Sequence, residues 1–385
     1  MLNVHIYLGP PRFASRVLKI TATLISRGIF DRVVIIATAD DGGPARESIG
    51  LGRDVWRVNR KYTGQNVTAV VKAFGILLWS FSVIRALASQ NVGCVNCHSL
   101  SVLPLCAALK VLKGSKLVYD THELETETVA AGRFRRISAR LVERSLMAFV
   151  DQLSVVNRSI QESYERSYGR KAWVVRNVPY RTDDAPARTY KLRHALRIED
   201  DELVFLYQGG MSRGRGIHLL LDAFMRIPDR HLVFLGYGDL AAIVQDYSRK
   251  QRNIHYHAAV SPGQLNEYTP DADVGLCIFE NVCMNHYFAL PNKLFEYLIC
   301  GVPVLVSDFP EMSRVVSDLE CGWCSAADAE RIRQVILKID RRSICDRRNN
   351  IAKSRSKFGW QMEENVLVTM YQEMFPSRCD AKELA

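Results

Sequence analysis

The chain has 385 residues, of which 48% are hydrophobic and 24% are charged, with 13 prolines. This composition excludes a disordered chain, a collagen-like repeat and a small disulfide scaffold, and the length suffices for two cored domains. The net charge of +10 is uneven: residues 1–190 carry 27 lysines and arginines against 15 aspartates and glutamates, whereas residues 191–385 carry 24 against 26. The excess predicts an anionic partner for the first half, such as a membrane surface, a nucleic acid or a phosphorylated substrate.

Targeting signals and cysteines indicate little about the function of the chain. The first 13 residues lack a basic segment followed by an apolar one, so we expect no secretion signal. Ten cysteines then indicate a reducing compartment and free thiols. Cys94, Cys97 and His98 match a haem-attachment pattern, and Cys321 with Cys324 resembles half of a zinc site. Haem attachment normally requires export, and the two pairs lie far apart in the chain, so we interpret both as structural.

Short apolar runs alternate with longer helical patterns through the first half, and they predict strands and helices in turn. Strands are expected over 4–8, 32–38, 94–97, 116–119, 152–156 and 172–175, and helices over 12–27, 67–89, 103–112, 134–149 and 160–168. The segment 67–87 is interrupted by Lys72 and Arg85, too closely spaced to leave a span across a bilayer of about 30 Å. It is either a core helix or a helix that docks on a membrane.

The alternation pauses over the Pro- and Asp-containing segment 177–186 and then resumes. Strands are expected over 203–208, 231–235, 253–257, 274–278 and 303–307, and helices over 216–225, 240–249, 292–300 and 360–375. The last of these has an apolar face at Met362, Val366, Met370 and Met374. We therefore predict an α/β protein with parallel sheets and right-handed crossovers, divided into a domain over 1–178, a linker over 179–190, a domain over 191–358 and a C-terminal helix over 359–378 that packs back on the first domain.

The strongest local motif is the glycine-rich loop 208–216, which follows a predicted strand and opens a helix. Gly209 and Gly210 let backbone approach a ligand closely, and the amides of the helix start favour an anion. Arg213 and Arg215 supply donors suited to phosphate. The loop has neither the Walker nor the dinucleotide-binding spacing. A phosphate or diphosphate site is favoured over a flexible surface turn.

The segment 290–297 (LPNKLFEY) is the second motif. Asn292 marks a helix start, and Lys293 lies in its first turn, where a cation is unfavourable unless an anion is near. Glu296 follows three residues later and is suited to accepting hydrogen bonds from ribose hydroxyls. A surface ion pair between Lys293 and Glu296 is the alternative.

A third motif, Asp120, His122 and Glu123, follows the strand predicted over 116–119. Polar groups just beyond a strand are typical of active sites in α/β proteins, and the histidine can donate a hydrogen bond or act as acid and base. The loop that contains Gly9 also follows a predicted strand. Either motif alone is equally compatible with a structural role.

The order and spacing of these motifs resemble the retaining GT-B glycosyltransferases of family 4, in particular bacterial polysaccharide and glycolipid members with a YQGG…GRG loop and an LPNKLFEY segment. The resemblance covers nearly the whole chain, through VVRNVP, LVFLGYG and CGVPVLVSD. It implies two Rossmann-like doubly wound domains facing a central cleft. It also implies transfer of a sugar from a UDP- or GDP-sugar to a hydroxyl of a glycan or lipid-linked acceptor, with retained anomeric configuration.

The family's roles carry over to matching positions. Gly9 would lie at the donor phosphates, His122 would contact the transferred sugar, and Glu296 matches the second glutamate of the family's E-x7-E motif, which binds the ribose. Arg215 lies where the family usually has a lysine, and Gly210 where many members carry an arginine. The candidate donor-binding residues are Gly9, Gly209, Gly210, Arg213, Arg215, Leu290, Asn292, Lys293, Leu294 and Glu296; the candidate catalytic residues are His122, Arg215 and Lys293; those on the acceptor side are Asp120, Glu123 and Arg133.

One position departs from the family pattern. The first glutamate of the motif is replaced by Phe288, which puts the usual contacts with the sugar hydroxyls in doubt. The main-chain amides of Ala289 and Leu290, together with Asn292 and Lys293, are the expected replacements. Lys293 is also expected to supply the phosphate charge that Gly210 lacks.

The expected partners follow from this interpretation. Arg215, Lys293 and helix N-termini would stabilise the departing diphosphate, so no metal and no cofactor are expected. Arg133 leads into a basic amphipathic helix that either lies on anionic lipid or is solvated. We expect a cytoplasmic enzyme, peripheral on the inner face of the cell membrane, that binds no nucleic acid because no binding motif is present. The alternatives are an epimerase or phosphorylase of the same architecture and a donor-binding, non-catalytic partner subunit.

Overall fold

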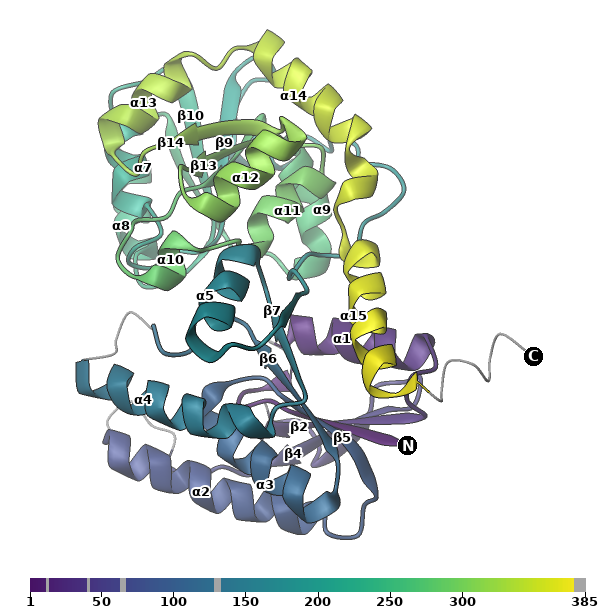
Figure 1. Ribbon diagram of the computed structural model, residues 1–385. Helices are drawn as coiled ribbons and strands as arrows, with labels where there is room; N and C mark the ends of the chain where they lie inside the picture. The colour runs from purple at the N-terminus through teal and green to yellow at the C-terminus, as the bar shows by residue number, and fades with distance from the viewer. Residues whose placement is uncertain (12–13, 40–41, 63–66, 128–132, 377–385) are drawn as a thin grey trace. The chain divides into compact units, whose positions relative to one another are not determined.

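The computed structural model describes residues 1–11, 14–39, 42–62, 67–127 and 133–376 (Figure 1). The chain divides into two compact units: unit 1 comprises Met1–Arg176 with Glu363–Ala385, and unit 2 comprises Asn177–Met362. The segment expected as a linker, 179–190, is thus part of unit 2. Its chain is tied down at both ends, because the Trp360 amide donates to the Pro179 carbonyl and the Thr189 amide donates to the Asp271 carboxylate.

The described part of unit 1 contains an eight-stranded sheet in the order β3-β4-β2-β1-β5-β6-β7-β8, parallel except for the β3–β4 pair. The strands are β1 (Leu2–Ile6), β2 (Arg32–Thr38), β3 (Arg46–Ser48), β4 (Arg53–Val58), β5 (Val92–Cys97), β6 (Lys116–Thr121), β7 (Gln152–Val155) and β8 (Ala172–Val174). All six strands predicted in this half are present. β3, at the edge of the sheet, and β4, next to it, were not predicted, because their charged residues hide the apolar signal.

The helices of unit 1 lie on both faces of this sheet. They are α1 (Ser15–Ser26), α2 (Ala69–Ala86), α3 (Leu103–Lys113), α4 (Arg133–Leu146) and α5 (Arg158–Tyr168). The chain crosses from β1 to β2 in one direction and from β4 to β8 in the other, so right-handed crossovers place α1 on one face and α2 to α5 on the opposite one. α2, α3 and α4 lie together in Figure 1. No helix in the described segments is long and apolar enough to span a membrane.

The C-terminal helix α15 (Trp360–Met374) packs on the α1 side of unit 1. The rings of Phe30 and Tyr371 meet edge to face with centroids 5.7 Å apart, and the Thr23 hydroxyl donates to Glu364 over 3.0 Å. The Tyr371 hydroxyl also donates to the Asn96 side chain in the sheet. Side chains of α15 therefore complete part of the hydrophobic core of unit 1.

Unit 2 contains a six-stranded parallel sheet in the order β11-β10-β9-β12-β13-β14. Its strands are β9 (Leu203–Gly210), β10 (Arg230–Tyr237), β11 (Ile254–Ala258), β12 (Val274–Cys277), β13 (Val304–Ser307) and β14 (Gly322–Ser325), and its helices are α6 (Lys191–Leu196), α7 (Ile217–Phe224), α8 (Ala241–Lys250), α9 (Leu265–Tyr268), α10 (Met284–Tyr287), α11 (Asn292–Ile299), α12 (Pro310–Leu319), α13 (Ala329–Leu337) and α14 (Arg341–Lys353). The predicted fold class, two doubly wound α/β domains, is confirmed.

Several elements of unit 2 were not predicted, although two of the missed helices carry a readable start signal. The Asp328 carboxylate accepts the Arg331 amide at the start of α13, and the Asp340 carboxylate accepts the Ser343 amide at the start of α14. An aspartate that caps the first turn is a sequence signal for a helix start. α6, α9, α10, α12 and β14 were also missed.

The strand orders create one switch point in each sheet. In unit 1 the chain proceeds outward from β1 on one side and from β5 on the other, and in unit 2 it does so from β9 and β12. Adjacent crossovers leave a sheet on opposite faces at such a point, which opens a crevice at the carboxyl ends of the two strands. These two places are where ligand-binding groups are expected.

Asp271 fixes the start of the second domain. Its buried carboxylate accepts the backbone amides of Thr189 at 2.9 Å, Tyr190 at 2.8 Å and Leu192 at 2.9 Å, which satisfies donors at the start of α6. Removing it takes the acceptor from the buried Leu192 amide and from the part-buried amides of Thr189 and Tyr190.

We predict that Asp271→Ala lowers the free energy of unfolding of unit 2 by about 2–4 kcal/mol. Urea denaturation read by hydrogen exchange of unit 2 amides measures the change. The matched control is Asp246→Ala, which removes a carboxylate that is 57% exposed and pairs with Arg249 on the surface, and which should cost less than about 1 kcal/mol. Equal effects in the two variants would contradict this assignment.

Candidate functional site

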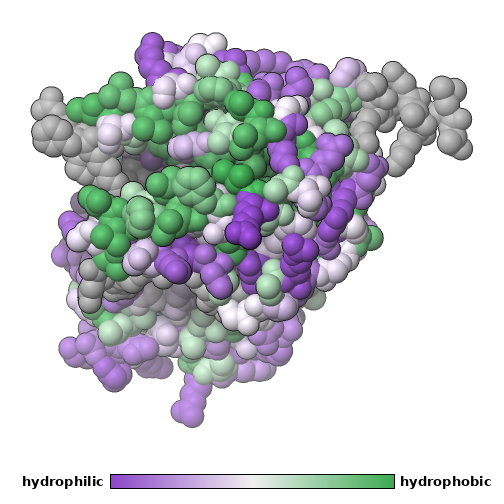
Figure 2. All heavy atoms as spheres, turned by 90° about the horizontal axis from the view of Figure 1, so that it is seen from below, coloured by the Kyte–Doolittle hydropathy of each residue, from purple (hydrophilic) through white to green (hydrophobic). Residues whose placement is uncertain are grey.

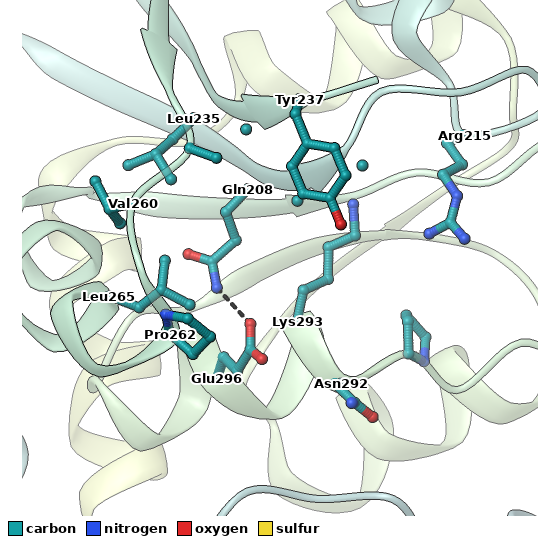
Figure 3. A pocket seen from close by; sticks show the side chains of 15 residues that line it. Gln208, Arg215, Leu235, Tyr237, Val260, Pro262, Leu265, Asn292, Lys293 and Glu296 are labelled. Atoms are coloured by element: carbon teal, nitrogen blue, oxygen red, sulfur yellow. Dashed lines mark hydrogen bonds between the residues drawn. The ribbon is translucent and has the colours of Figure 1, made fainter. Parts of the chain in front are cut away.

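A cavity of about 360 Å³ lies at the switch point of unit 2. It is formed by the ends of β9 and β10, the loop after β11 and the start of α11 (Figure 3). Its lining residues are Gln208, Gly209, Gly210, Arg215, Leu235, Gly236, Tyr237, Ala259, Val260, Pro262, Leu265, Pro291, Asn292, Lys293 and Glu296. The structure thus brings together the two motifs that the sequence singled out in this half.

Lys293 stands in the middle of this pocket (Figure 3). The residue is only 7% exposed, and its ammonium has no hydrogen-bond partner in the described structure. The Nζ atom lies 3.5 Å from the centroid of the Tyr207 ring, a cation–π contact. The surface ion pair with Glu296, the alternative that the sequence left open, is not formed among the described residues, since Lys293 is buried and its ammonium donates to no acceptor there. A buried cation without an acceptor is a place where an anionic ligand is favoured.

Arg215 lies on one side of Lys293, on the loop between β9 and α7 (Figure 3). Its guanidinium carbon is 5.4 Å from the centroid of the Phe279 ring. The loop is anchored, because the Gly216 amide donates to the Glu280 carboxylate at 3.2 Å and a Cβ at Gly216 would lie 2.5 Å from the Ile278 side chain. This anchoring argues against a flexible surface turn and holds a second cation at the cavity.

Glu296 and Gln208 lie on the other side of Lys293. Gln208 Nε2 donates to Glu296 Oε2 over 2.6 Å, and the Thr269 hydroxyl donates to Gln208 Oε1 over 2.9 Å. The buried Tyr297 hydroxyl accepts the Gln208 amide at 2.8 Å and donates to the Leu206 carbonyl at 2.8 Å; burial raises its pKa well above the usual value. These contacts fix the orientation of the Glu296 carboxylate before any ligand arrives.

The far wall of the pocket is apolar. Leu235, Val260, Pro262 and Leu265 line it on the side away from Arg215 (Figure 3). The ends of β9 and β10 meet closely there, since a Cβ at Gly236 would lie 2.0 Å from the Gly209 carbonyl oxygen. The cavity therefore has a cationic end and an apolar end, with a carboxylate between them.

Not every donor-site candidate of this half lines the cavity. Arg213 is exposed on the loop, Leu294 is fully buried, and Leu290 is absent from the lining although the next residue, Pro291, takes part in it. Phe288 follows α10 and also lies outside the lining. The sequence missed the supporting residue Gln208 and the apolar wall. The rule that ligands bind at strand ends, applied to β10 and β11, would have pointed to that wall.

In unit 1, a hydrogen-bonded cluster occupies the switch point between β1 and β5. Asp120 is buried and pairs with Arg16, whose Nη2 lies 2.6 Å from Oδ1. His98 Nδ1 donates to Asp120 Oδ2 at 3.1 Å, and His5 Nδ1 donates to His98 Nε2 at 2.8 Å. His122 Nε2 lies 3.3 Å from Asp120 Oδ2, and its side chain is 30% exposed. His122 is therefore the member of this cluster that a ligand can reach.

Electrostatics fixes the charge states of this cluster. Burial by itself raises the pKa of Asp120, but the Arg16 guanidinium and the hydrogen bonds from His122 and His98 outweigh it and hold that pKa well below its usual range. Burial lowers the pKa of His5 and of His98 from the ordinary value of 6.5. Asp120 is thus a carboxylate beside the neutral imidazole of His98.

The other unit 1 candidates lie around this cluster. Gly9 follows β1, where its carbonyl accepts the Thr38 amide at 3.2 Å. Glu123 is exposed just beyond His122. Arg133 is the first residue of α4, and its side chain lies outside the described part of the structure.

Two groups of side chains have the composition of a cation site. Ligand atoms of His98, Asp120 and His122 lie within 4.8 Å of one another, but the Arg16 guanidinium already occupies the same carboxylate and repels a second cation. Asp271 and Asp273 form an Asp-x-Asp pair, but both are buried, and Asp273 pairs with Arg193 at 2.6 Å. Neither donor set fits a divalent ion.

The cysteine pairs carry no such chemistry. Cys94 and Cys97 are buried in β5, and burial raises the pKa of both thiols; Cys321 is buried at the start of β14. The cysteines in the described segments form no disulfide.

Two doubly wound parallel domains with polar groups at each switch point define the GT-B class of fold. Residues 14–181 match a family model described as a glycosyl transferase 4-like domain, and residues 202–340 match one described as glycosyl transferases group 1. The two halves of the chain belong to these glycosyltransferase families, and the chain is a glycosyltransferase. No curated protein matches it by sequence.

Solved structures share this fold over nearly the whole chain. Sucrose-phosphate synthase from Thermosynechococcus elongatus superposes with a TM-score of 0.78 at 16% identity, covering 98% of this chain and 100% of that one. HepE from Anabaena in complex with UDP-glucose superposes with a TM-score of 0.69 at 15% identity, covering 97% and 98%. A glycosyltransferase from Rickettsia africae gives a TM-score of 0.69 at 12% identity, covering 98% and 99%.

The buried histidines make the stability of unit 1 depend on pH. Their folded-state pKa values are lowered, so the unfolded chain binds more protons below about pH 6.5 and stability must fall as pH falls. We predict that the free energy of unfolding drops between about pH 6.5 and 5 by up to about 1.4 kcal/mol per pH unit for each histidine.

His5→Gln isolates this effect, because glutamine can still donate to His98 but does not titrate. The slope of unfolding free energy against pH, measured in urea with hydrogen exchange of β1 and β5 amides as readout, should fall by about half. The same change at the exposed His218 should leave it unaltered. An unchanged slope in His5→Gln would refute the assignment.

Proposed function

We propose that this glycosyltransferase moves a sugar from a nucleotide diphosphate sugar to a hydroxyl of a glycan or lipid-linked acceptor, with retention of anomeric configuration. The observation that carries the proposal is the buried, unpartnered ammonium of Lys293 beside Arg215. HepE, which shares the fold, binds UDP-glucose and UDP, which supports a nucleotide sugar as the donor.

The cationic and apolar ends of the cavity indicate where each part of the donor binds. The diphosphate lies at the cationic end with Lys293 and Arg215, since charge-assisted hydrogen bonds there are the strongest available. Glu296 accepts hydrogen bonds from the ribose hydroxyls, and Gln208 positions it. The nucleobase, uracil or guanine in the proposal, packs against Val260, Pro262 and Leu265.

The chemical step breaks the bond between the anomeric carbon and the diphosphate oxygen and forms a bond to the acceptor oxygen. Negative charge grows on the departing diphosphate, and Lys293 and Arg215 stabilise it without a metal. Retention without a carboxylate nucleophile implies attack on the face from which the diphosphate departs. On that face the departing oxygen is the nearest base for the acceptor's proton. His122, held by the buried Asp120, contacts the transferred sugar.

Two positions depart from the family pattern in a compensating way. Gly210 lacks the arginine that many members carry, but a Cβ built there meets nothing within 4 Å, and Lys293 supplies a cation nearby. Phe288 lacks the carboxylate of the first motif glutamate. We assign its contacts with the sugar to the Asn292 side chain, which lines the cavity. The Ala289 amide, expected to share them, donates to the His286 carbonyl at 3.2 Å, and Leu290 is absent from the lining.

The first test is donor binding by a charge-deleted variant. Lys293→Met removes the ammonium but keeps apolar packing on Tyr207, so we predict that UDP affinity, measured by calorimetry, falls at least about 30-fold. The unliganded variant should unfold no more easily than the wild type, because a buried unpaired cation costs stability. Weaker binding accompanied by a lower unfolding temperature would instead mean that Lys293 is a structural residue.

A rescue and a control sharpen this test. Gly210→Arg in the Lys293→Met background places a guanidinium in open space beside the same end of the cavity, and it should recover at least about fivefold in affinity. Lys250→Met, an exposed lysine at the end of α8, should leave UDP binding unchanged.

The second test is turnover without a metal. We predict that release of UDP or GDP from a panel of nucleotide sugars, in the presence of glycan acceptors, continues in EDTA at a rate within about twofold of that with Mg²⁺, because protein cations replace the ion. The anomeric configuration of the product, read by NMR, should equal that of the donor. Interconversion of donor sugars without release would indicate an epimerase, and donor binding without any turnover would indicate a non-catalytic partner subunit.

A further inference from the structure

The outer surface of the α2–α4 layer in unit 1 is apolar where solvent-facing helices are normally polar. On α2, Val70, Phe74, Leu77 and Phe81 recur every three or four residues, which places them on one face of the helix. They are 78%, 51%, 52% and 62% exposed.

The opposite face of α2 is the one that packs on the unit. Trp79 is 1% exposed and Val83 is fully buried, and the Trp79 ring N–H donates to the Val58 carbonyl at 3.1 Å. α2 is therefore apolar on both faces. Packing against the core of unit 1 explains only one of these two apolar faces.

Neighbouring helices of the same layer extend the exposed apolar surface. Ile137 and Leu141 are exposed on α4, and Val111 and Leu112 at the end of α3. Figure 2, seen from below Figure 1, shows hydrophobic side chains gathered over the side where α2 and α4 lie, with hydrophilic ones at the border. We call the exposed residues Val70, Phe74, Leu77, Leu78, Phe81, Ile137 and Leu141 the apolar face. A contiguous patch of this kind on a soluble domain marks an interaction surface.

The helices that carry the apolar face are strongly basic, although Glu127, which precedes α4 in the chain, pairs with Arg140 and, at 3.7 Å, with Arg136. By sequence, α2, α3 and α4 contain nine lysines and arginines and a single acid, Glu143. Glu143 is buried and accepts hydrogen bonds from the hydroxyls of Tyr119 and Tyr164, at 2.9 Å and 2.8 Å, and from that of Tyr168. It does not neutralise the surface.

We propose that the apolar face docks unit 1 on an anionic lipid bilayer, with α2 and α4 lying in the interface plane. Apolar side chains enter the boundary between headgroups and acyl chains, and the arginines meet lipid phosphates. Arg85 on α2 and Arg140 and Arg144 on α4 are exposed and share the sides of these helices with the apolar residues. The inference does not rest on the proposed donor or reaction.

A second copy of the chain fits this surface less well. In a symmetric dimer the same patch meets itself, so the cations of one copy would face those of the other around the apolar contact. Charge complementarity therefore favours an anionic partner over self-association.

The test measures sedimentation of the full chain with vesicles of phosphatidylcholine alone or with about one third phosphatidylglycerol. Binding to the anionic vesicles should exceed that to neutral ones at least about tenfold and should weaken as salt rises from 0.05 to 0.5 M. The triple variant Phe74→Ser, Leu77→Ser, Phe81→Ser should reduce the partition coefficient at least about tenfold. Arg140→Gln with Arg144→Gln should reduce it and flatten the salt dependence.

The control is Leu337→Ser, the same kind of change on α13 of unit 2 at a side chain that is 47% exposed, and it should leave partitioning unchanged. UDP binding without vesicles should be equal in all these variants, so the donor site is tested separately. Absent or equal binding of the wild type and the triple variant to anionic vesicles overturns the proposal. So does a wild-type dimer by light scattering that the triple variant abolishes.

Discussion

An ammonium group held almost out of water, without an acceptor, is the interaction on which the donor end of the cavity depends. Transfer of an ion from water to the protein interior costs several kcal/mol, and the close cation–π contact with Tyr207, with a second, longer one to Phe279 at 5.8 Å, returns only about 2 kcal/mol of it. Lys293 is kept in this state because α11 is fixed by Tyr297, whose hydroxyl joins the helix to β9 on both its donor and acceptor sides. The stability of the rest of the fold offsets the free-energy cost of burying this ammonium. An anion that enters is then met by a cation that needs no rearrangement, which is what stabilising a departing diphosphate requires.

Much of the fold could be predicted from sequence because buried parallel strands read as apolar runs and the crossover helices as 3.6-residue patterns. The β3–β4 edge could not, since Arg46, Glu47 and Arg53 make it look like a loop. α15 illustrates a subtler limit. Its predicted apolar face included Met362 and Met370, yet Met362 is 45% exposed, whereas Leu367 and Tyr371 are buried beside Met370. Spacing along a helix indicates that one face is apolar, but its direction is set by the surface it meets.

The candidate site divides in the same way between local and long-range information. Lys293 and Arg215 were predictable, because a cation at a helix start and arginines in a glycine loop are locally unfavourable unless an anion binds. Asp120 was expected on the acceptor side, but its environment depends on Arg16, which lies 104 residues away in sequence and occupies its carboxylate. Gln208 shows no signal of its own either, since its role exists only once Glu296 and Thr269 flank it. Residues that the crossover connections bring together from distant parts of the chain show no recognisable pattern in a single sequence.

Net charge did not indicate which half of the chain contains the cavity with the unpartnered cation. The first half carries the whole positive excess, which suggested a phosphorylated substrate there among other partners, yet the cavity with the unpartnered cation lies in the half with slightly more acids than bases. Two cations suffice for a diphosphate in such a cavity, because Lys293 is buried and Arg215 half-buried there, and the lower dielectric strengthens each contact. Excess positive charge that is spread over exposed helices acts collectively instead. Its summed electrostatic field reaches about one Debye length from the surface and attracts an extended surface of negative charge. The asymmetry of the chain is therefore better explained by a broad anionic partner for unit 1 than by its sugar donor.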